Sequence, residues 1–301
     1  MPPAVAIVLN GISRKKEKFY LHFYPALARK FVLKVFETKR AGHAVDLAAQ
    51  AADQGFEFII AAGGDGTLNQ VINGVHLNKS NSQTVIGLIP LGTGNDFART
   101  CGLSADAFRL TDLIESNHPL PVDLGQITCL SHESRKITRY FINACSVGMG
   151  PEAVKRLAKS NRALGPALTY WKAITATFLT HRPQEIYCKT PSWEWQGKVR
   201  VLAVANGRSF GNSLYIAPDA LLDDGLLDVF IAGELPLWKF LLYQQAMKAK
   251  KKIRDRLIRY NQSARIELQS PEPCAIEAEG ELVGFLPAEI DVIPKKIKFL
   301  R

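Results

Sequence analysis

Two short glycine-rich segments carry residue types that could bind a phosphate group. They read Gly63-Gly64-Asp65-Gly66-Thr67 and Pro90-Leu91-Gly92-Thr93-Gly94-Asn95-Asp96-Phe97. Each follows an apolar run, 56–62 or 85–89, that predicts a buried strand, and each opens a stretch that favours a helix. Glycine leaves backbone N–H groups open to an anion, and the dipole of the next helix adds partial positive charge there. Two such turns in one domain indicate a nucleoside triphosphate site.

The polar side chains of these turns have a binding and a structural interpretation. Asp65 could reach a nucleotide-bound Mg²⁺, and the Thr67 hydroxyl could cap the following helix or bond a phosphate. Asn95 and Asp96 are predicted to cap the second helix, and Arg99 could offset phosphate charge. The alternative for either turn alone is an ordinary capped connection between a strand and a helix.

Strands and helices alternate through the first third of the chain, which predicts a parallel α/β sheet. Helices are expected over 43–54, 67–77 and from about residue 95, between the apolar runs. Ligands of such sheets bind at the carboxyl ends of the strands, where both glycine turns fall. We therefore expect the two turns to lie at the same edge.

After about Pro121 the chain becomes rich in strand patterns, with helices expected at about 151–180 and 236–259. This favours an α/β domain over residues 1–121 and an antiparallel β-sandwich over 122–286. Two domains are also the better expectation for a chain of 301 residues. Residues 287–301 could return to the first domain.

The net charge of +10 fits nucleic acid, an anionic membrane surface or a polyanionic substrate. The run KAKKKIRDRLIR at 248–259 follows an apolar segment, Leu235–Leu242, which suits contact with a lipid headgroup layer. A second basic group has roughly helical spacing and comprises Lys155, Arg156, Lys159 and Arg162. The alternative is a solvated helix face. No binding module for nucleic acid is recognisable.

The five cysteines form no CxxC pair, and no segment is long and apolar enough to span a bilayer. We therefore expect a cytoplasmic protein with reduced cysteines, in peripheral contact with a membrane. The six histidines do not cluster at metal-ligand spacing.

The two turns together resemble the catalytic domain of the lipid kinase family, which includes diacylglycerol, sphingosine and ceramide kinases and their bacterial relatives. Segments 141–153, 205–229 and 274–284 resemble later parts of that family in the same order. The resemblance implies a three-layer α/β domain like that of NAD kinase and diacylglycerol kinase, a C-terminal β-sandwich, and an active site in the cleft between them. It also implies Mg²⁺-dependent transfer of the ATP γ-phosphate to a lipid hydroxyl. Diacylglycerol is the default acceptor, while a sphingoid base, another glycerolipid and a homodimeric assembly remain open.

The resemblance also implies which residues contact the nucleotide and metal. With the glycine turns themselves, the expected nucleotide-binding residues are Asn10, Thr38, Gly63, Gly64, Asp65, Gly66, Thr67, Leu68, Asn69, Gln70, Gly92, Thr93, Asn95 and Asp96. Asn10 is the weaker candidate because Gly11 follows it where the family has proline. Asp224 and the backbone carbonyls of Leu221 and Leu226 match a structural Mg²⁺ site, although the same segment could be a simple turn.

The expected catalytic residues are Glu281, Glu279 and Asp65. The family has Asp-Gly-Glu where this chain has Glu-Gly-Glu. Phosphoryl transfer needs a carboxylate that accepts the proton of the attacking hydroxyl. In a strand, residues two apart point to the same face, so both glutamates are predicted to face the substrate. We expect Glu281 to accept the proton and Glu279 to assist.

Two other classes of function remain as alternatives. One is a kinase for a soluble acceptor, such as NAD or a sugar phosphate, because those enzymes also use a glycine–aspartate–glycine turn after a strand. The other is a non-enzymatic nucleotide-binding regulator on the same fold.

Overall fold

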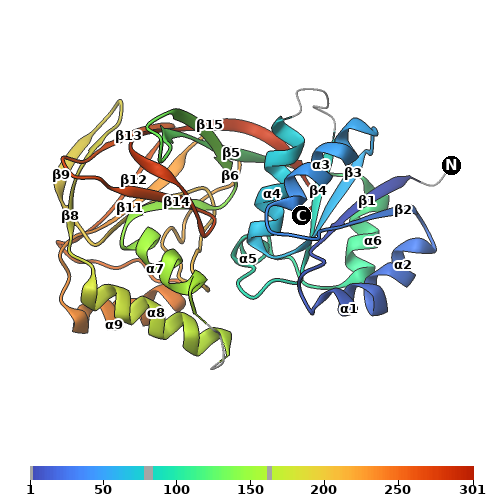
Figure 1. The fold of residues 1–301 in the computed structure, drawn as a ribbon, viewed down its shortest axis with the longest axis horizontal. Helices are drawn as coiled ribbons and strands as arrows, with labels where there is room; N and C mark the ends of the chain where they lie inside the picture. The colour runs from blue at the N-terminus through green and yellow to red at the C-terminus, as the bar shows by residue number, and fades with distance from the viewer. Residues whose placement is uncertain (1–2, 78–83, 161–164) are drawn as a thin grey trace. The chain divides into compact units, whose positions relative to one another are not determined.

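The chain forms two units (Figure 1). The structure is a computed structural model, and it describes residues 3–77, 84–160 and 165–301. Unit 1 comprises Met1–Val122 together with Lys295–Arg301, and unit 2 comprises Asp123–Pro294. The last residues of the chain therefore belong with the first ones.

Unit 1 is built on a parallel sheet in the order β4-β3-β1-β2. Its strands are β1 (Ala4–Leu9), β2 (Val32–Glu37), β3 (Phe58–Gly63) and β4 (Val85–Pro90). Every residue of β3 and β4 is buried, as expected of central strands covered on both faces. Because the strands are parallel, the segments that follow them all leave from one edge of the sheet.

Helices cover both faces of this sheet (Figure 1). They are α1 (Lys16–Lys18), the π-helix η1 (Phe19–Phe23), α2 (Tyr24–Ala28), α3 (His43–Asp53), α4 (Asp65–Leu77), α5 (Asp96–Thr100) and α6 (Ala107–Ser116). Apolar side chains of η1, α2 and α6 pack with alternate residues of β1 and β3. The helix α3 packs against α4 and β1. This three-layer arrangement confirms the α/β class predicted for the N-terminal part.

Unit 2 is an antiparallel β-sandwich, as predicted. Its strands are β5 (Leu120–Leu130), β6 (Lys136–Phe141), β7 (Ala144–Gly148), β8 (Gln184–Lys189), β9 (Glu194–Val199), β10 (Val201–Ala205), β11 (Leu227–Ala232), β12 (Ile258–Ser263), β13 (Arg265–Gln269), β14 (Ala275–Ala278) and β15 (Glu281–Phe299). One buried apolar cluster draws on strands from β5 to β15. At its end β15 pairs in parallel with β4, with Lys298 opposite Val85.

Three helices of unit 2 are described, and they are α7 (Met149–Ala158), α8 (Pro166–Thr180) and α9 (Leu237–Lys248). The rings of Phe178 in α8 and Phe240 in α9 stack with centroids 4.2 Å apart. Arg162, one of the basic residues singled out in the sequence, lies outside the described residues.

The prediction of a helix over 236–259 was wrong beyond residue 248. Lys250 has a positive φ of 59°, which is incompatible with a continuing right-handed helix. Asp255 then holds the following segment against α9, because it pairs with Lys239 (2.5 Å) and accepts a hydrogen bond from Tyr243 (2.5 Å). The side chain of Ile253, in the same segment, is buried. Beyond Lys248 the basic run therefore leaves the helix, and a tertiary ion pair fixes it.

Candidate functional site

The two glycine turns lie side by side at the carboxyl edge of the unit 1 sheet. β3 and β4 pair with Gly63 opposite Pro90, and the N–H groups of Leu91 and Gly92 both donate to the Gly63 carbonyl (2.8 and 3.0 Å). A Cβ on Gly92 would stand only 2.4 Å from Gly64 Cα. The turns therefore pack backbone against backbone, and a side chain at Gly92 would force them apart.

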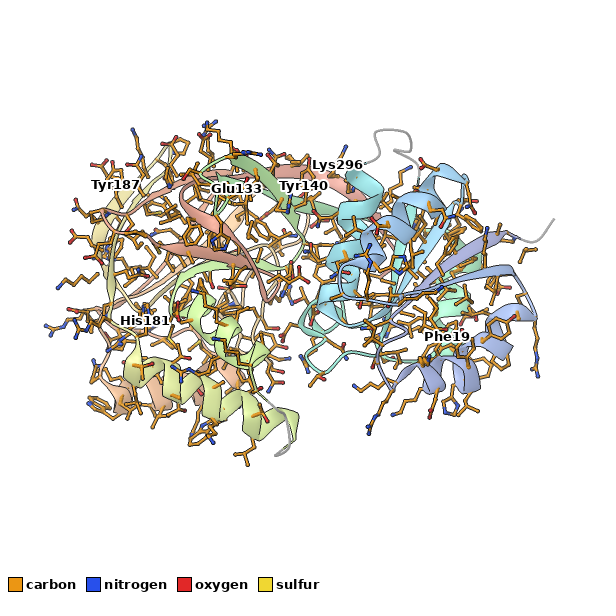
Figure 2. All side chains as sticks on the ribbon, in the orientation of Figure 1. Phe19, Glu133, Tyr140, His181, Tyr187 and Lys296 are labelled. Atoms are coloured by element: carbon orange, nitrogen blue, oxygen red, sulfur yellow. The ribbon has the colours of Figure 1, made fainter. Side chains whose placement is uncertain are left out.

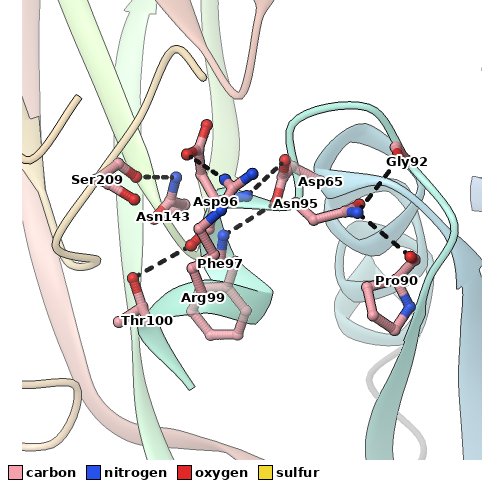
Figure 3. Close-up of polar contacts among 10 residues, drawn as sticks. All are labelled: Asp65, Pro90, Gly92, Asn95, Asp96, Phe97, Arg99, Thr100, Asn143 and Ser209. Carbon is pink, nitrogen blue, oxygen red and sulfur yellow. Dashed lines mark hydrogen bonds and ion pairs between the residues drawn. The ribbon is translucent and has the colours of Figure 1, made fainter. Parts of the chain in front are cut away.

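Asp65 joins the two turns through its carboxylate. It accepts hydrogen bonds from the backbone N–H groups of Asp96 (3.1 Å) and Phe97 (3.0 Å), the first residues of α5 (Figure 3). These N–H groups have no partner within the helix, so a carboxylate from another segment satisfies them. Burial raises the pKa of the Asp65 carboxyl; the two N–H bonds oppose this rise and the charge of Asp96 adds to it.

This arrangement corrects the predicted capping of both helices. Asn95 has a left-handed backbone (φ 54°) and does not cap α5; its side-chain N–H donates to the carbonyls of Pro90 and Gly92, at 3.2 Å each. Asp96 is the first residue of α5 and forms an ion pair with Arg99 (3.0 Å). α4 begins at Asp65, so Thr67 lies inside the first turn, where its side chain packs on Gly63. The sequence could not show that the cap comes from the neighbouring turn.

Other predicted nucleotide-binding residues collect at the same edge. The Asn10 side chain, after β1, donates to the Thr67 hydroxyl (3.5 Å), and Thr38, after β2, accepts from the Gly11 N–H (3.1 Å). Gly64, Gly66, Thr93 and Gly94 belong to the two turns themselves. Asn69 and Gln70 follow in the second turn of α4. The side chain of Leu68 is fully buried in the protein core, so it can contribute only through its backbone.

Lys15 is a residue of this edge that the sequence analysis missed. Its ammonium group donates to the carbonyl of Gly92 (2.6 Å), which places a cation directly on the second turn. A cation here would attract a phosphate, whereas Arg99 already shares its charge with Asp96. The available signal was the basic segment Arg14–Lys18 that follows the first strand, but nothing in the sequence distinguished Lys15 from Lys16, which instead pairs with Glu37 (2.6 Å).

The predicted metal-binding segment of unit 2 is a turn fixed by a buried carboxylate. Asp123, which is fully buried, accepts from the Gly225 N–H (2.7 Å), and Asp224 accepts from the Leu226 N–H (3.0 Å). Burial raises the pKa of Asp228 to about 6, and the charges of Asp224 and Asp219 add to the rise. The carboxylates of Asp219, Asp224 and Asp228 thus lie close enough to influence one another.

The donors of this turn fit a hard cation. Carboxylate oxygens have further lone pairs, and one carboxylate with two backbone carbonyls suits a Mg²⁺ that keeps several waters. Among the described residues, no group of three or more His, Cys, Asp or Glu side chains could hold a metal ion by itself. The assignment of Asp224, Leu221 and Leu226 to Mg²⁺ stays a prediction.

The two candidate bases do not share one strand, which corrects the expectation that they point to the same face. β14 ends at Ala278 and β15 begins at Glu281, so Glu279 and Gly280 form the turn between them, with φ of 55° and 79°. Glu279 Oε1 accepts from the N–H groups of Ile142 (2.9 Å) and Asn143 (2.6 Å). Glu281 is exposed at the start of β15. The Glu-Gly pair adopts the left-handed geometry of a tight hairpin turn.

Comparisons with known proteins identify the family. Residues 4–127 match the diacylglycerol kinase catalytic domain family, and residues 145–301 match the YegS C-terminal NAD kinase beta sandwich-like domain family. The diacylglycerol kinase of Bacillus subtilis (strain 168) is 30% identical over 94% of this chain and 91% of that protein. A protein of Yersinia enterocolitica named "Probable lipid kinase YegS-like" is 28% identical over 98% of this chain and 96% of its own length. The chain belongs to the diacylglycerol kinase and YegS-like family of lipid kinases.

Solved structures show the same fold. A diacylglycerol kinase from Bacillus anthracis str. Sterne has a TM-score of 0.71 at 20% identity, over 99% of this chain and 96% of that one. Yeast NADH kinase in complex with NADH has a TM-score of 0.51 at 10% identity, over 99% of this chain and 83% of that one. The N-terminal α/β unit and the C-terminal β-sandwich of this chain thus have the fold of these solved structures.

We expect Asp65→Ala to destabilise unit 1 more than loss of an ordinary helix cap. The substitution leaves two helix N–H groups without their acceptor, and a buried unsatisfied N–H costs about 1–3 kcal/mol. The matched control is Asp106→Ala, because Asp106 caps the exposed start of α6 through the N–H groups of Phe108 and Arg109. Loss of that cap should cost about 1 kcal/mol.

Urea unfolding and amide hydrogen exchange measure the difference. Exchange of the Asp96 and Phe97 N–H groups should accelerate in Asp65→Ala and stay unchanged in Asp106→Ala. Equal costs for the two variants, with unchanged protection at Asp96 and Phe97, would contradict the tertiary cap.

Proposed function

We propose that this chain transfers the γ-phosphate of ATP, with Mg²⁺, to the hydroxyl of diacylglycerol. The observation that carries the proposal is the contact between the two glycine turns, which brings two sets of backbone N–H groups to one edge of the sheet. The acceptor is inferred from the relatives, several of which are named diacylglycerol kinases. Other lipid alcohols remain candidates for the same site.

Unit 1 would hold the triphosphate. N–H groups at the start of α4 and in the Gly92–Asn95 turn would bind the phosphate oxygens, and Lys15 would offset their charge. Thr38 and Asn10 border these turns. A Mg²⁺ bound with the nucleotide would supply positive charge at the phosphates, and Asp224 with the carbonyls of Leu221 and Leu226 would hold a second, structural Mg²⁺.

Unit 2 would supply the carboxylate that receives the proton of the lipid hydroxyl. Glu281 is the better candidate because its side chain is exposed, whereas Glu279 Oε1 is already engaged by two backbone N–H groups. Hydrogen bonds to a carboxylate stabilise its charged form and so make it a weaker proton acceptor. Glu279 would then orient the turn that carries Glu281.

The proposal is tested by incubating the protein with γ-labelled ATP and Mg²⁺ in separate reactions. The acceptors are diacylglycerol in mixed micelles, a total lipid extract, NAD and fructose 6-phosphate. We expect label in phosphatidic acid and none in the soluble acceptors. Glu281→Gln should lower kcat by about 100-fold or more, as removal of a general base does.

Glu289→Gln is the matched control for that variant. Glu289 also lies on β15 but pairs with Arg265 (2.9 Å), so its loss should leave kcat unchanged. Label in only a soluble acceptor would overturn the lipid assignment. Nucleotide binding without transfer to any acceptor would instead support a regulatory protein.

We further propose that unit 2 makes peripheral contact with an anionic membrane through α8 and α9. None of the helices in the described ranges combines the length and apolar character needed to cross a bilayer. Leu168, Trp171 and Leu179 lie along one exposed stripe of α8, and Trp238 and Leu242 are exposed one turn apart on α9. Exposed cations accompany them on α8, at the end of α9 and after it: Lys172, Lys248, Lys250, Lys251, Arg254 and Arg256. Exposed aromatic residues next to cations suit an anionic lipid interface.

The double variant Trp171→Ala with Trp238→Ala should bind anionic vesicles at least about fivefold more weakly, because each indole contributes buried apolar area at the interface. Co-sedimentation with phosphatidylcholine vesicles, with and without phosphatidylglycerol, measures this. Phe108→Ala is the control, because Phe108 is 79% exposed but lies in unit 1. Equal binding to neutral vesicles would remove the electrostatic part of the proposal.

A further inference from the structure

A buried carboxyl group lies two residues before the first candidate base. Glu277 in β14 is only 2% exposed. A buried carboxyl is costly unless it is hydrogen-bonded, and this one has two partners. Ser146 Oγ donates to Glu277 Oε1, and the N–H of Gly280 donates to Oε2 (3.1 Å).

The surroundings of Glu277 hold its side chain in one direction. β7 and β14 pair with Ser146 directly opposite Glu277. The first turn of α7 closes over them, since a Cβ on Gly150 would stand 2.1 Å from Ser146 Oγ and 3.4 Å from Glu277 Oε1. Glycine is thus required at 150 by the carboxyl and its serine partner.

The turn that Glu277 contacts includes a glutamate in an unfavourable backbone conformation. Glu279 and Gly280 both have positive φ, and a glutamate rarely adopts this conformation. Hydrogen bonds must therefore compensate for it. The Glu279 N–H donates to the Ala144 carbonyl (3.1 Å), and the Gly280 N–H donates to Glu277. Of these two N–H groups, only that of Gly280 donates to a side chain, whereas the Glu279 carboxylate holds the turn through the N–H groups of Ile142 and Asn143.

We propose that Glu277 is a positioning residue for phosphoryl transfer, whose carboxyl fixes the Gly280 N–H and thereby the directions of the Glu279 and Glu281 side chains. The inference rests on the proposed function, in which one of these glutamates receives the proton, but it holds for either of them. Glu277 does not itself touch substrate, because α7 and the sheet enclose it.

The charge of Glu277 gives this role a pH dependence. Burial raises the pKa of Glu277 to about 7, so it changes charge near neutral pH. Burial also raises the pKa of Cys145, its neighbour on β7, well above 9, so that thiol stays neutral. The helix α7 packs over Glu277, but its charged side chains are exposed to solvent: Glu152, Lys155 and Arg156. Glu279 and Glu281 are the acidic groups of the adjoining turn. Ionisation of Glu277 strengthens the hydrogen bond that it accepts from the Gly280 N–H and so holds the turn more firmly, so kcat should rise through about pH 7.

Two substitutions separate positioning from simple packing. Glu277→Gln keeps the shape and both hydrogen bonds, since its amide can accept from Gly280 and donate to Ser146. Glu277→Ala removes the acceptor. Ile266→Ala is the matched control, because Ile266 is fully buried in the apolar cluster of unit 2 and lies on β13.

Once the assay above has detected phosphorylation of diacylglycerol by the wild-type protein, steady-state kinetics are measured for the variants. We expect Glu277→Ala to lower kcat about tenfold or more while the KM for ATP changes less than about twofold, the pattern of a lost transition-state interaction. Glu277→Gln should retain kcat within about threefold of wild type and lose the inflection near pH 7. Ile266→Ala should lose thermal stability and keep kcat. Wild-type kcat in Glu277→Ala, or an equal loss in Ile266→Ala, would overturn the proposal.

A second measurement does not depend on activity. Exchange of the Gly280 N–H, followed by NMR, should accelerate in Glu277→Ala and remain slow in Glu277→Gln and Ile266→Ala. Absence of phosphate transfer by the wild type would defeat the proposed function alone. Unchanged protection of Gly280 in Glu277→Ala would defeat the positioning role.

Discussion

The contact between Gly64 and Gly92 is the constraint on which the rest of unit 1 depends. A Cβ at Gly92 would lie 2.4 Å from Gly64 Cα, so the carboxyl ends of β3 and β4 can approach only as bare backbone. Asp65 then ties the two turns together by accepting the first N–H groups of α5. The parallel sheet brings the turns to one edge, glycine lets them touch, and a carboxylate fixes their spacing. Two helix starts and one lysine thus face the same small region, which suits a triphosphate better than a single anion.

The same device recurs in unit 2. In each case a carboxylate accepts hydrogen bonds from backbone N–H groups of a turn. Asp123 accepts from Gly225, and Glu279 accepts from Ile142 and Asn143, each across a long separation in the sequence. Glu277 accepts from Gly280, three residues further along the chain. Each turn contains or adjoins a residue assigned to metal binding or proton transfer. Buried carboxylates are costly, and the two buried ones, Asp123 and Glu277, are tolerated because each accepts hydrogen bonds from donors within reach. Hydrogen bonds to carboxylates, and not apolar packing alone, therefore fix the geometry of these turns.

The fold could be predicted from the sequence because its signals are local. Apolar runs followed by glycine-rich turns predict β3 and β4, and the strand-rich sequence after Pro121 predicts the sandwich. Tertiary partners could not be predicted. Nothing local showed that Asp65 caps α5 rather than α4, or that the basic run leaves the helix and is held by a pair between Asp255 and Lys239. In the sequence, no local feature distinguishes Glu277 from the other residues of its strand. The Glu279-Gly280 turn had only a weak local signal, because a tight hairpin favours Asn, Asp or Gly before the glycine, whereas glutamate rarely adopts the positive φ that it has here.

The central claim is that the paired turns bind the phosphates of ATP. The most direct test is an NMR titration of the amide-labelled protein with a non-hydrolysable ATP analogue, compared with adenosine alone. Binding through the turns predicts that the N–H signals of Gly64, Gly66, Thr93 and Gly94 shift together with the analogue and not with adenosine. If these four signals stay in place while the nucleotide binds elsewhere, the account of this edge as a triphosphate site is contradicted.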